Sequence, residues 1–286
     1  MKRLLKQIKY LLILTVLLGF LLANTFLIQP NSIRVRYETI ASNKIPAGLD
    51  NYTILFFSDL HYNNYTTHHR AQKTINAINS VGANTVVYLG DLYDHPTHNE
   101  ITEEIQTELV LLLQQIDAKY GKFAILGNHD YESEKASIKV RQTLNAANFE
   151  VLTNTNQKLF FGEEDYLELI AIDSLLLGAP DVSRAFKGIS STTFNIVITH
   201  CPDLYDELDY ALTDLVLTGH SHGGQVYLPL LESYFRPYGA EKYFRGKHDL
   251  PNQPLLDITN GVGTTQIDAR FNAPAEIVVY RLQRVD

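Results

Sequence analysis

Side chains that bind divalent metals follow short apolar segments at five places in this 286-residue chain. At each place a run of aliphatic and aromatic residues ends, and a carboxylate, amide or imidazole side chain comes next. These three ligand types together suit Mn, Fe, Zn or Ni, and do not distinguish among them. The five places are Asp59 with His61, Asp91, Asn128 with His129 and Asp130, His200, and His220 with His222.

The pair His220 and His222 shows why the set must be read together. In an extended segment, residues two apart point to the same side, and the neighbouring glycines let the backbone turn sharply. Two histidines by themselves are more often part of a solvated surface loop. Five segments that all end in the same way predict a metal site instead.

The elements that would position these residues alternate between strands and helices. We expect buried strands at 53–57, 84–89, 123–126, 194–199 and 214–217, further strands at 255–258 and 275–280, a strand with one solvated face at 33–37, helices at 70–80, 100–120 and 133–147, and an antiparallel pair at 149–161 and 167–172. This alternation predicts an α/β fold with layers around a sheet. Ligands of such folds bind at the carboxyl ends of the strands, which is where all five places fall.

The size of the ligand set indicates two metal ions rather than one. A catalytic zinc site uses three protein ligands, whereas two ions that share a bridging carboxylate need more. Two divalent ions would bring four positive charges against the two carboxylates Asp59 and Asp91, and the excess suits a phosphate ester. The predicted ligands are Asp59, His61, Asp91, Asn128, His200, His220 and His222.

The ordered motifs D-x-H, G-D, G-N-H-D, a lone histidine and G-H-x-H resemble those of the calcineurin-like metallophosphoesterase family, from about residue 52 to the C-terminus. The resemblance implies a four-layer α-β-β-α sandwich of two mixed sheets. Residues 222–229, 261–263 and 270–277 resemble the bacterial membrane-associated branch, which includes UDP-2,3-diacylglucosamine pyrophosphatases and wall-associated phosphoesterases.

The resemblance also assigns roles to individual residues. It implies that Asp59, His61 and His222 bind one metal, that Asn128, His200 and His220 bind the other, and that Asp91 bridges them. His129 is implied to protonate the leaving oxygen or to stabilise charge in the transition state, while a metal-bridging hydroxide attacks phosphorus. Asp130 is a candidate for orienting His129, with a helix-capping acid as the equal alternative, and Asp94 is a candidate for supporting the ligands.

The N-terminus carries a membrane signal. Residues 1–10 are basic, with Lys2, Arg3, Lys6 and Lys9, and residues 11–28 are almost wholly apolar. This length spans roughly 27 Å as a helix, close to the core of a bilayer. We predict an uncleaved single-pass anchor with the N-terminus in the cytoplasm, followed by a linker and first strand at 29–48 and a catalytic domain at 49–286. A cleaved signal peptide is the alternative.

Composition limits the partners and the covalent cross-links that this chain can have. The net charge of −8 argues against a nucleic-acid partner, and the single cysteine, Cys201, excludes an intramolecular disulfide. We expect Cys201 to be a packed residue and the histidines at 68, 69, 95 and 98 to lie in solvated loops. The aromatic-rich segment 228–244 is expected to be core and loop packing, with a lipid-facing wall beside the site as the alternative.

Three functional hypotheses follow. The first is a membrane-anchored, extracytoplasmic phosphoesterase or phosphodiesterase with two divalent ions, manganese among the candidates, acting on lipid-linked or envelope-linked phosphates. The second is a UDP-2,3-diacylglucosamine-type pyrophosphatase that faces the cytoplasm. The third is a non-catalytic module that binds metal and phosphate. The sequence leaves the oligomeric state open.

Overall fold

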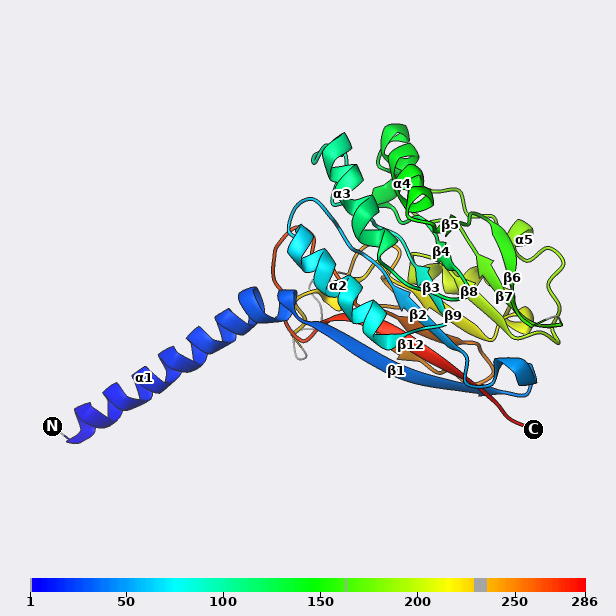
Figure 1. The fold of residues 1–286 in the computed structure, drawn as a ribbon. Helices are drawn as coiled ribbons and strands as arrows, with labels where there is room; N and C mark the ends of the chain where they lie inside the picture. Colours follow the sequence, from blue (N-terminus) through cyan, green and yellow to red (C-terminus); the bar gives the residue numbers. More distant parts are fainter. Residues whose placement is uncertain (1, 163, 229–235) are drawn as a thin grey trace.

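Two six-stranded mixed sheets pack face to face in the computed structural model, which describes residues 2–162, 164–228 and 236–286. The strand orders are β1-β12-β2-β3-β4-β5 and β10-β11-β9-β8-β7-β6. Helices cover the outer faces of both sheets (Figure 1), so the layers follow the predicted α-β-β-α order.

The first sheet is built mainly from parallel strands. Strands β2 to β5 run parallel to one another, β12 runs antiparallel to β2, and β1 runs parallel to β12 along its whole length. Helices α2 (His68–Val81), α3 (Glu103–Gln114) and α4 (Glu134–Ala146) pack on its outer face through their apolar sides. The strands are β1 (Ile33–Ser42), β2 (Thr53–Phe57), β3 (Thr85–Tyr88), β4 (Lys122–Ala124), β5 (Glu150–Val151) and β12 (Ala275–Arg284).

The second sheet has a parallel centre and antiparallel edges. Its outer layer is thin, because it contains the short helix α5 (Val182–Ala185) and 3₁₀ turns such as Pro202–Glu207. One hydrophobic core lies between the two sheets, where side chains from β2, β8, β9 and β12 are almost completely buried. The strands are β6 (Thr155–Phe161), β7 (Asp165–Ala171), β8 (Asn195–Ile198), β9 (Leu215–Thr218), β10 (Gly246–His248) and β11 (Leu255–Ile258).

One expected strand is in fact two. The segment 149–161 was predicted to pair as a unit with 167–172, but Glu150–Val151 joins the first sheet as β5 while β6 pairs with β7 in the second. Asn154, between them, has a left-handed φ of 48°, and its side chain accepts hydrogen bonds from two backbone amides. An asparagine tolerates this conformation, which lets the chain cross from one sheet to the other.

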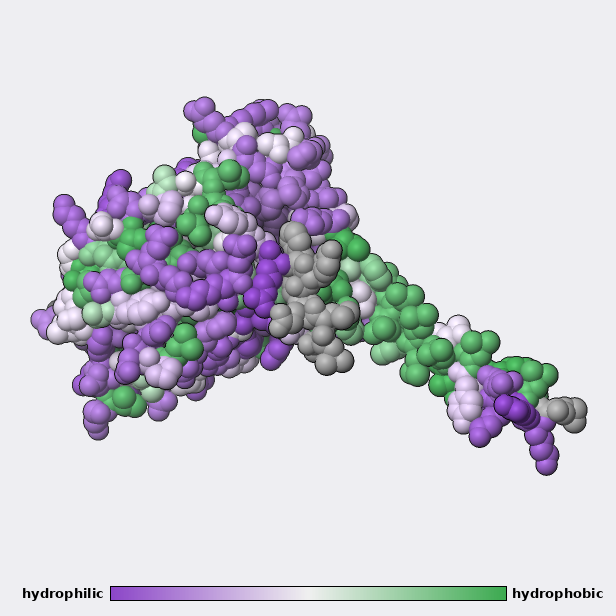
Figure 2. All heavy atoms as spheres, turned by 180° about the vertical axis from the view of Figure 1, so that it is seen from behind, coloured by the Kyte–Doolittle hydropathy of each residue, from purple (hydrophilic) through white to green (hydrophobic). Residues whose placement is uncertain are grey.

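The N-terminal helix α1 (Lys2–Ala23) projects away from the domain, and none of its residues is buried. With the turns that continue it to Asn31, it is long and apolar enough to cross a membrane by length and composition. Figure 2 shows it as a hydrophobic rod with a hydrophilic tip, next to a largely hydrophilic domain surface.

The strand register places the base of this helix and the carboxyl ends of the central strands at the same end of the molecule. β1 begins at Ile33, opposite Ala275 of β12. In the antiparallel β12–β2 pair, Val278 lies opposite Phe56, the penultimate residue of β2. Asp59 therefore follows a strand end that lies about two residues, or roughly 7 Å, along the sheet from the start of β1.

Candidate metal centre

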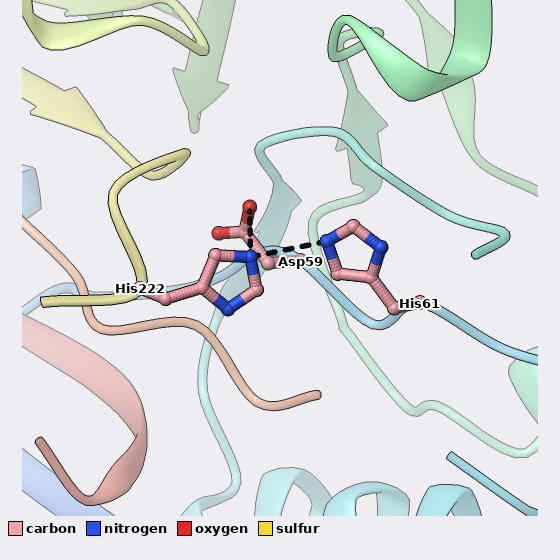
Figure 3. A group of neighbouring side chains, drawn as sticks. All are labelled: Asp59, His61 and His222. Atoms are coloured by element: carbon pink, nitrogen blue, oxygen red, sulfur yellow. Dashed lines mark hydrogen bonds and ion pairs between the residues drawn. The ribbon is translucent and has the colours of Figure 1, made fainter. Parts of the chain in front are cut away.

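The first cluster of potential ligands joins residues 59, 61 and 222. Asp59 and His61 follow β2, and His222 lies in the turn after β9. The Nε2 atoms of His61 and His222 are 3.1 Å apart, and Asp59 Oδ1 lies 3.6 Å from His222 Nε2. All three side chains point toward one another (Figure 3), and their ligand atoms lie within 4.8 Å of each other.

The second cluster joins residues 91, 200 and 220. Asp91 follows β3, His200 follows β8 and His220 follows β9, and their ligand atoms also lie within 4.8 Å of one another. His200 Nε2 is 3.1 Å from Asp91 Oδ2, and His61 Nε2 of the first cluster is 3.8 Å from the same oxygen. Asp91 thus lies between the two clusters, in the position that a bridging carboxylate needs.

Two site atoms fit metal ions by their lack of other partners. Asn128 Oδ1 is buried without a hydrogen-bond partner among the described residues, and His200 Nε2 is buried with only the Asp91 carboxylate beside it, at 3.1 Å. His200 donates its other ring nitrogen, Nδ1, to the carbonyl of Leu89 at 2.7 Å, and His220 Nε2 lies 2.8 Å from the carbonyl of Tyr238. Histidine ligands are commonly oriented in this way, with one nitrogen fixed by a carbonyl and the other directed at the ion.

The backbone around the ligands is unusual as well. Five of the seven predicted ligands have a positive φ, between 46° and 69°, a conformation that residues other than glycine rarely adopt. A Cβ on Gly127 would collide with the Asp91 carboxylate, and one on Gly219 would lie 2.7 Å from Asp59 Oδ2. The turns are therefore tight because backbone and ligand side chains share one small space. The five residues are Asp59, His61, Asp91, His220 and His222.

Burial and neighbouring charges together shift the pKa values of the ligand side chains. Burial alone would raise the pKa of Asp91, but the adjacent His200, His129 and His61 hold that pKa well below its usual range. Burial lowers the pKa of His200, yet the Asp91 carboxylate outweighs this and raises it to about 9. Burial, followed by repulsion from His200, lowers the pKa of His220 to about 4. A buried carboxylate in this setting needs a cation beside it, which suits a divalent ion.

His129 does not belong to either cluster but faces the same space. Its backbone N–H donates to Asp91 Oδ1 at 2.9 Å, and its Nδ1 lies 2.5 Å from Glu132 Oε1. Asp130 was suggested as the residue that orients His129, but its carboxylate is engaged elsewhere. Both of its oxygens accept hydrogen bonds from backbone N–H groups, those of Asp91, Leu92 and Gly127. Asp130 therefore supports the turn that carries Asp91, while Glu132 orients His129.

Two neighbouring residues complete this part of the site. Asp94 Oδ1 lies 3.4 Å from His61 Nδ1 and accepts a hydrogen bond from Thr265 Oγ1 at 3.1 Å, so it is placed to orient the His61 ring. His95 is not the solvated histidine that was predicted, because it is only partly exposed and its ring lies 4.2 Å from that of His129. His95 Nδ1 also contacts Glu132 Oε1 at 3.0 Å.

The remaining sequence predictions divide between core and surface. Cys201 is buried, and burial raises the pKa of its thiol to about 12, as expected for a packed residue. In the aromatic segment, Tyr243 and Phe244 are buried as predicted, whereas Tyr238 is 70% exposed. Tyr234 and Phe235 lie outside the described residues.

A cavity of about 430 Å³ opens over the two clusters. Asp91, Asn128, His129, His220 and His222 form its floor. Its walls are mostly apolar and include Leu176, Val226, Pro237, Tyr238 and Ile267. The arrangement can therefore hold a phosphate group over the ligands while an apolar part of the same molecule contacts the walls.

The family profile of calcineurin-like phosphoesterases matches residues 52–224, which include every residue of both clusters. The chain belongs to the calcineurin-like phosphoesterase family. Membership of this family places the chain among the hydrolases that act on phosphate esters. The two clusters of ligand side chains fit divalent metal ions as the cofactors.

Curated relatives extend the likeness beyond the profile. The metallophosphoesterase YkuE of Bacillus subtilis is 31% identical over 90% of this chain and 87% of its own length. A transmembrane protein with a metallophosphoesterase domain from Danio rerio is 27% identical over 83% of this chain and 54% of its own length. The UDP-2,3-diacylglucosamine pyrophosphatase LpxG of Chlamydia trachomatis is 25% identical over 89% of this chain and 90% of its own length.

The sequence did not predict the roles of two residues that support the site. Glu132 is three positions after His129, a spacing at which side chains meet within a helical turn, and this was the one available signal. Arg270 is completely buried, and its guanidinium donates to four backbone carbonyls, three of them in the loop 260–263. That loop contacts Asp59 through the bond from Gly263 N to Asp59 O at 2.8 Å, and no local pattern predicts such a contact.

Proposed function

We propose that this chain is a membrane-anchored phosphoesterase that uses two divalent metal ions to hydrolyse a phosphate ester or diester of a lipid-linked substrate. The observation that carries the proposal is the position of Asp91 between two ligand clusters, on the floor of a cavity with apolar walls. Asp59, His61 and His222 would hold one ion, and Asn128, His200 and His220 the other, with Asp91 shared between them.

Each residue of the site has a task in this reaction. When bound, the two ions would acidify a water molecule and neutralise charge on the phosphate. His129 donates a proton to the leaving oxygen, since its ring lines the cavity and Glu132 fixes its other nitrogen. Asp94 keeps the His61 ring in place, and Asp130 holds the turn that carries Asp91.

The apolar walls and the position of the helix support a lipid-linked substrate. Val226 and Ile267 are 39% and 49% exposed, so the walls meet solvent as hydrophobic surface. The wall segment 265–267 continues to Arg270, whose N–H donates to the carbonyl of Thr25 at the base of the apolar helix, at 2.9 Å. A substrate held in the bilayer by acyl chains would reach the cavity from this side.

The basic residues before the apolar segment favour an extracytoplasmic catalytic domain. A second candidate function has the opposite orientation: hydrolysis of the diphosphate of a UDP-diacylglucosamine-like substrate in the cytoplasm, which the likeness to LpxG favours. Accessibility of a C-terminal tag to a membrane-impermeant reagent in intact cells separates the two. Labelling supports the extracytoplasmic orientation, and protection contradicts it.

Catalysis itself is tested with the purified full chain and bis-p-nitrophenyl phosphate, with Mn²⁺, Zn²⁺, Fe²⁺ or Ni²⁺ added in turn. We expect hydrolysis with at least one metal. For His129→Ala we expect metal content to stay unchanged and kcat to fall by about 10² or more on the corresponding phenyl ester, whose leaving group needs a proton. Absence of turnover with every metal would favour the non-catalytic module. Comparing a diacylglycerol-linked phosphate with its deacylated counterpart then tests the lipid preference, which predicts the lower KM for the acylated compound.

A further inference from the structure

A third group of metal-binding side chains, His95, His98 and Glu132, lies beside the metal centre, on the loop after β3 and the turn after β4. Their ligand atoms all lie within 4.8 Å of one another, as do those of the two clusters. None of the three is among the seven predicted ligands. Two imidazoles and a carboxylate are a set that binds Zn²⁺, with a water molecule in the remaining position.

The contacts within this group are like those of the two clusters. His95 Nδ1 lies 3.0 Å from Glu132 Oε1, close to the 3.1 Å between paired ligand atoms in each cluster. The rings of His95 and His98 lie edge to face, with their centres 6.0 Å apart. Thr97, between them, donates its backbone N–H and its hydroxyl to Glu132 Oε2 at 3.1 and 2.6 Å. The loop that carries both histidines is therefore fastened to the carboxylate.

Each histidine of the group also has its second ring nitrogen beside a hydroxyl. His95 Nε2 lies 3.3 Å from Thr265 Oγ1, and His98 Nδ1 lies 3.2 Å from Thr97 Oγ1. Contacts of this kind orient the histidine ligands of metal ions, because one nitrogen is fixed and the other remains for the ion. His95 has a left-handed φ of 40°, a conformation that it shares with five of the seven predicted ligands.

An ion can reach this group from solvent. His98 is exposed, and 31% of the His95 side chain and 13% of the Glu132 side chain are exposed. The group has one carboxylate and lies partly in water, whereas the metal centre has two buried carboxylates, so its attraction for a cation is weaker. We therefore expect it to bind an ion only after the metal centre is filled.

We propose that His95, His98 and Glu132 form a third site for a divalent metal such as Zn²⁺, which is filled at high metal concentration and then slows turnover. Glu132 Oε1 is the reason for the slower turnover, since it also lies 2.5 Å from His129 Nδ1. An ion bound to this oxygen competes with His129 for it and weakens the contact that orients the ring. This effect rests on the proposed role of His129 as proton donor, whereas binding of the ion does not.

Binding is tested by equilibrium dialysis of the untagged full chain against increasing free Zn²⁺, with bound zinc measured by elemental analysis. We expect His98→Gln to weaken binding of the last zinc ion by about tenfold or more and to leave the tighter ions in place. The control His69→Gln removes an exposed histidine of α2, next to His68 in sequence, and should bind zinc as the wild type does. Equal zinc binding by all three proteins at every concentration overturns the proposal.

The effect on turnover is measured with the same three proteins at low and at excess zinc. Excess zinc should lower the wild-type kcat by about tenfold for diphenyl phosphate, whose leaving group needs a proton, and by less for bis-p-nitrophenyl phosphate. His98→Gln should keep the wild-type rate at low zinc and lose most of this inhibition, while His69→Gln retains it. Equal inhibition of all three proteins contradicts the link between the third site and His129. If the chain hydrolyses neither ester, the proposed function fails, and the zinc content still decides whether the third site exists.

Discussion

Replacing Glu132 by glutamine tests whether His129 acts as the acid that protonates the leaving oxygen. Glu132 lies outside both ligand clusters, so the change leaves all seven predicted metal ligands in place. Its carboxylate contacts four groups: Oε1 faces His129 Nδ1 and His95 Nδ1 at 2.5 and 3.0 Å, and Oε2 accepts from Thr97 N and Oγ1 at 3.1 and 2.6 Å. Glutamine has the same shape but only one acceptor oxygen and no charge.

The size of the effect follows from these contacts. The amide must turn its NH₂ either toward His129 and His95 or toward the two Thr97 donors, so one pair of hydrogen bonds is lost. A hydrogen bond to a charged group is worth about 1.5–3 kcal/mol. If that interaction holds His129 in the orientation that donates a proton, its loss lowers kcat by about 10- to 100-fold for a substrate whose leaving group needs that proton. We expect metal content to stay constant, with Glu134→Gln, two positions along and exposed, as the control.

The leaving group distinguishes acid catalysis from a merely structural role. Nitrophenolate leaves easily without a proton, whereas an alkoxide or phenolate of higher pKa needs one. The defect of Glu132→Gln should therefore be small for bis-p-nitrophenyl phosphate and several-fold larger for the corresponding phenyl ester. An equal loss for both esters, or a parallel loss of metal, would refute the assignment of His129 and Glu132 as acid and positioning residue.

Three further substitutions test the rest of the site. Asp91→Ala should reduce the content of both metals, measured by elemental analysis, because its carboxylate lies between the clusters; loss of one ion only would contradict the bridging role. Gly127→Ala should lower both metal content and Tm, since the new Cβ would overlap the Asp91 carboxylate. Arg270→Met should lower the free energy of unfolding by about 3–5 kcal/mol in urea, because it leaves four buried carbonyls without their donor. Arg281→Met, on an exposed position of β12, is its control and should change stability by less than about 0.5 kcal/mol.

The sequence predicted the α/β alternation and the clustering of the site residues because both depend on short-range patterns, whereas the two-sheet, four-layer arrangement was implied by the resemblance to the family. Buried strands are apolar runs of four or five residues, and the residue after each run is fixed at the carboxyl edge by the direction of the strand. Strand direction places Asp59 and Asp91 at one edge of the first sheet. It places His200 and His220 at one edge of the second sheet, and the packing of the two sheets brings the two pairs together.

What escaped prediction depends on contacts between distant segments. The crossing of the chain at Asn154 required knowledge of which sheet each half of 149–161 would join. The interaction of His95 with His129 and Glu132 depends on how the loop after β3 folds over the turn after β4, because residues 95 and 129 are far apart in sequence. Arg270 lies in the stretch 270–277 that resembles the membrane-associated branch, but its role is not apparent until the carbonyls around it are known.

The backbone conformation supplies an independent argument that the clustered side chains have a function. A residue other than glycine loses roughly 1 kcal/mol or more in the left-handed region, and glycine removes this cost. Five of the seven predicted ligands adopt that region, although glycines are used directly beside them, at positions 90, 219 and 223. Backbone preference alone would place glycine at the ligand positions too. Aspartate and histidine occupy these strained positions because their side chains are needed there, which a set of ordinary surface turns would not require.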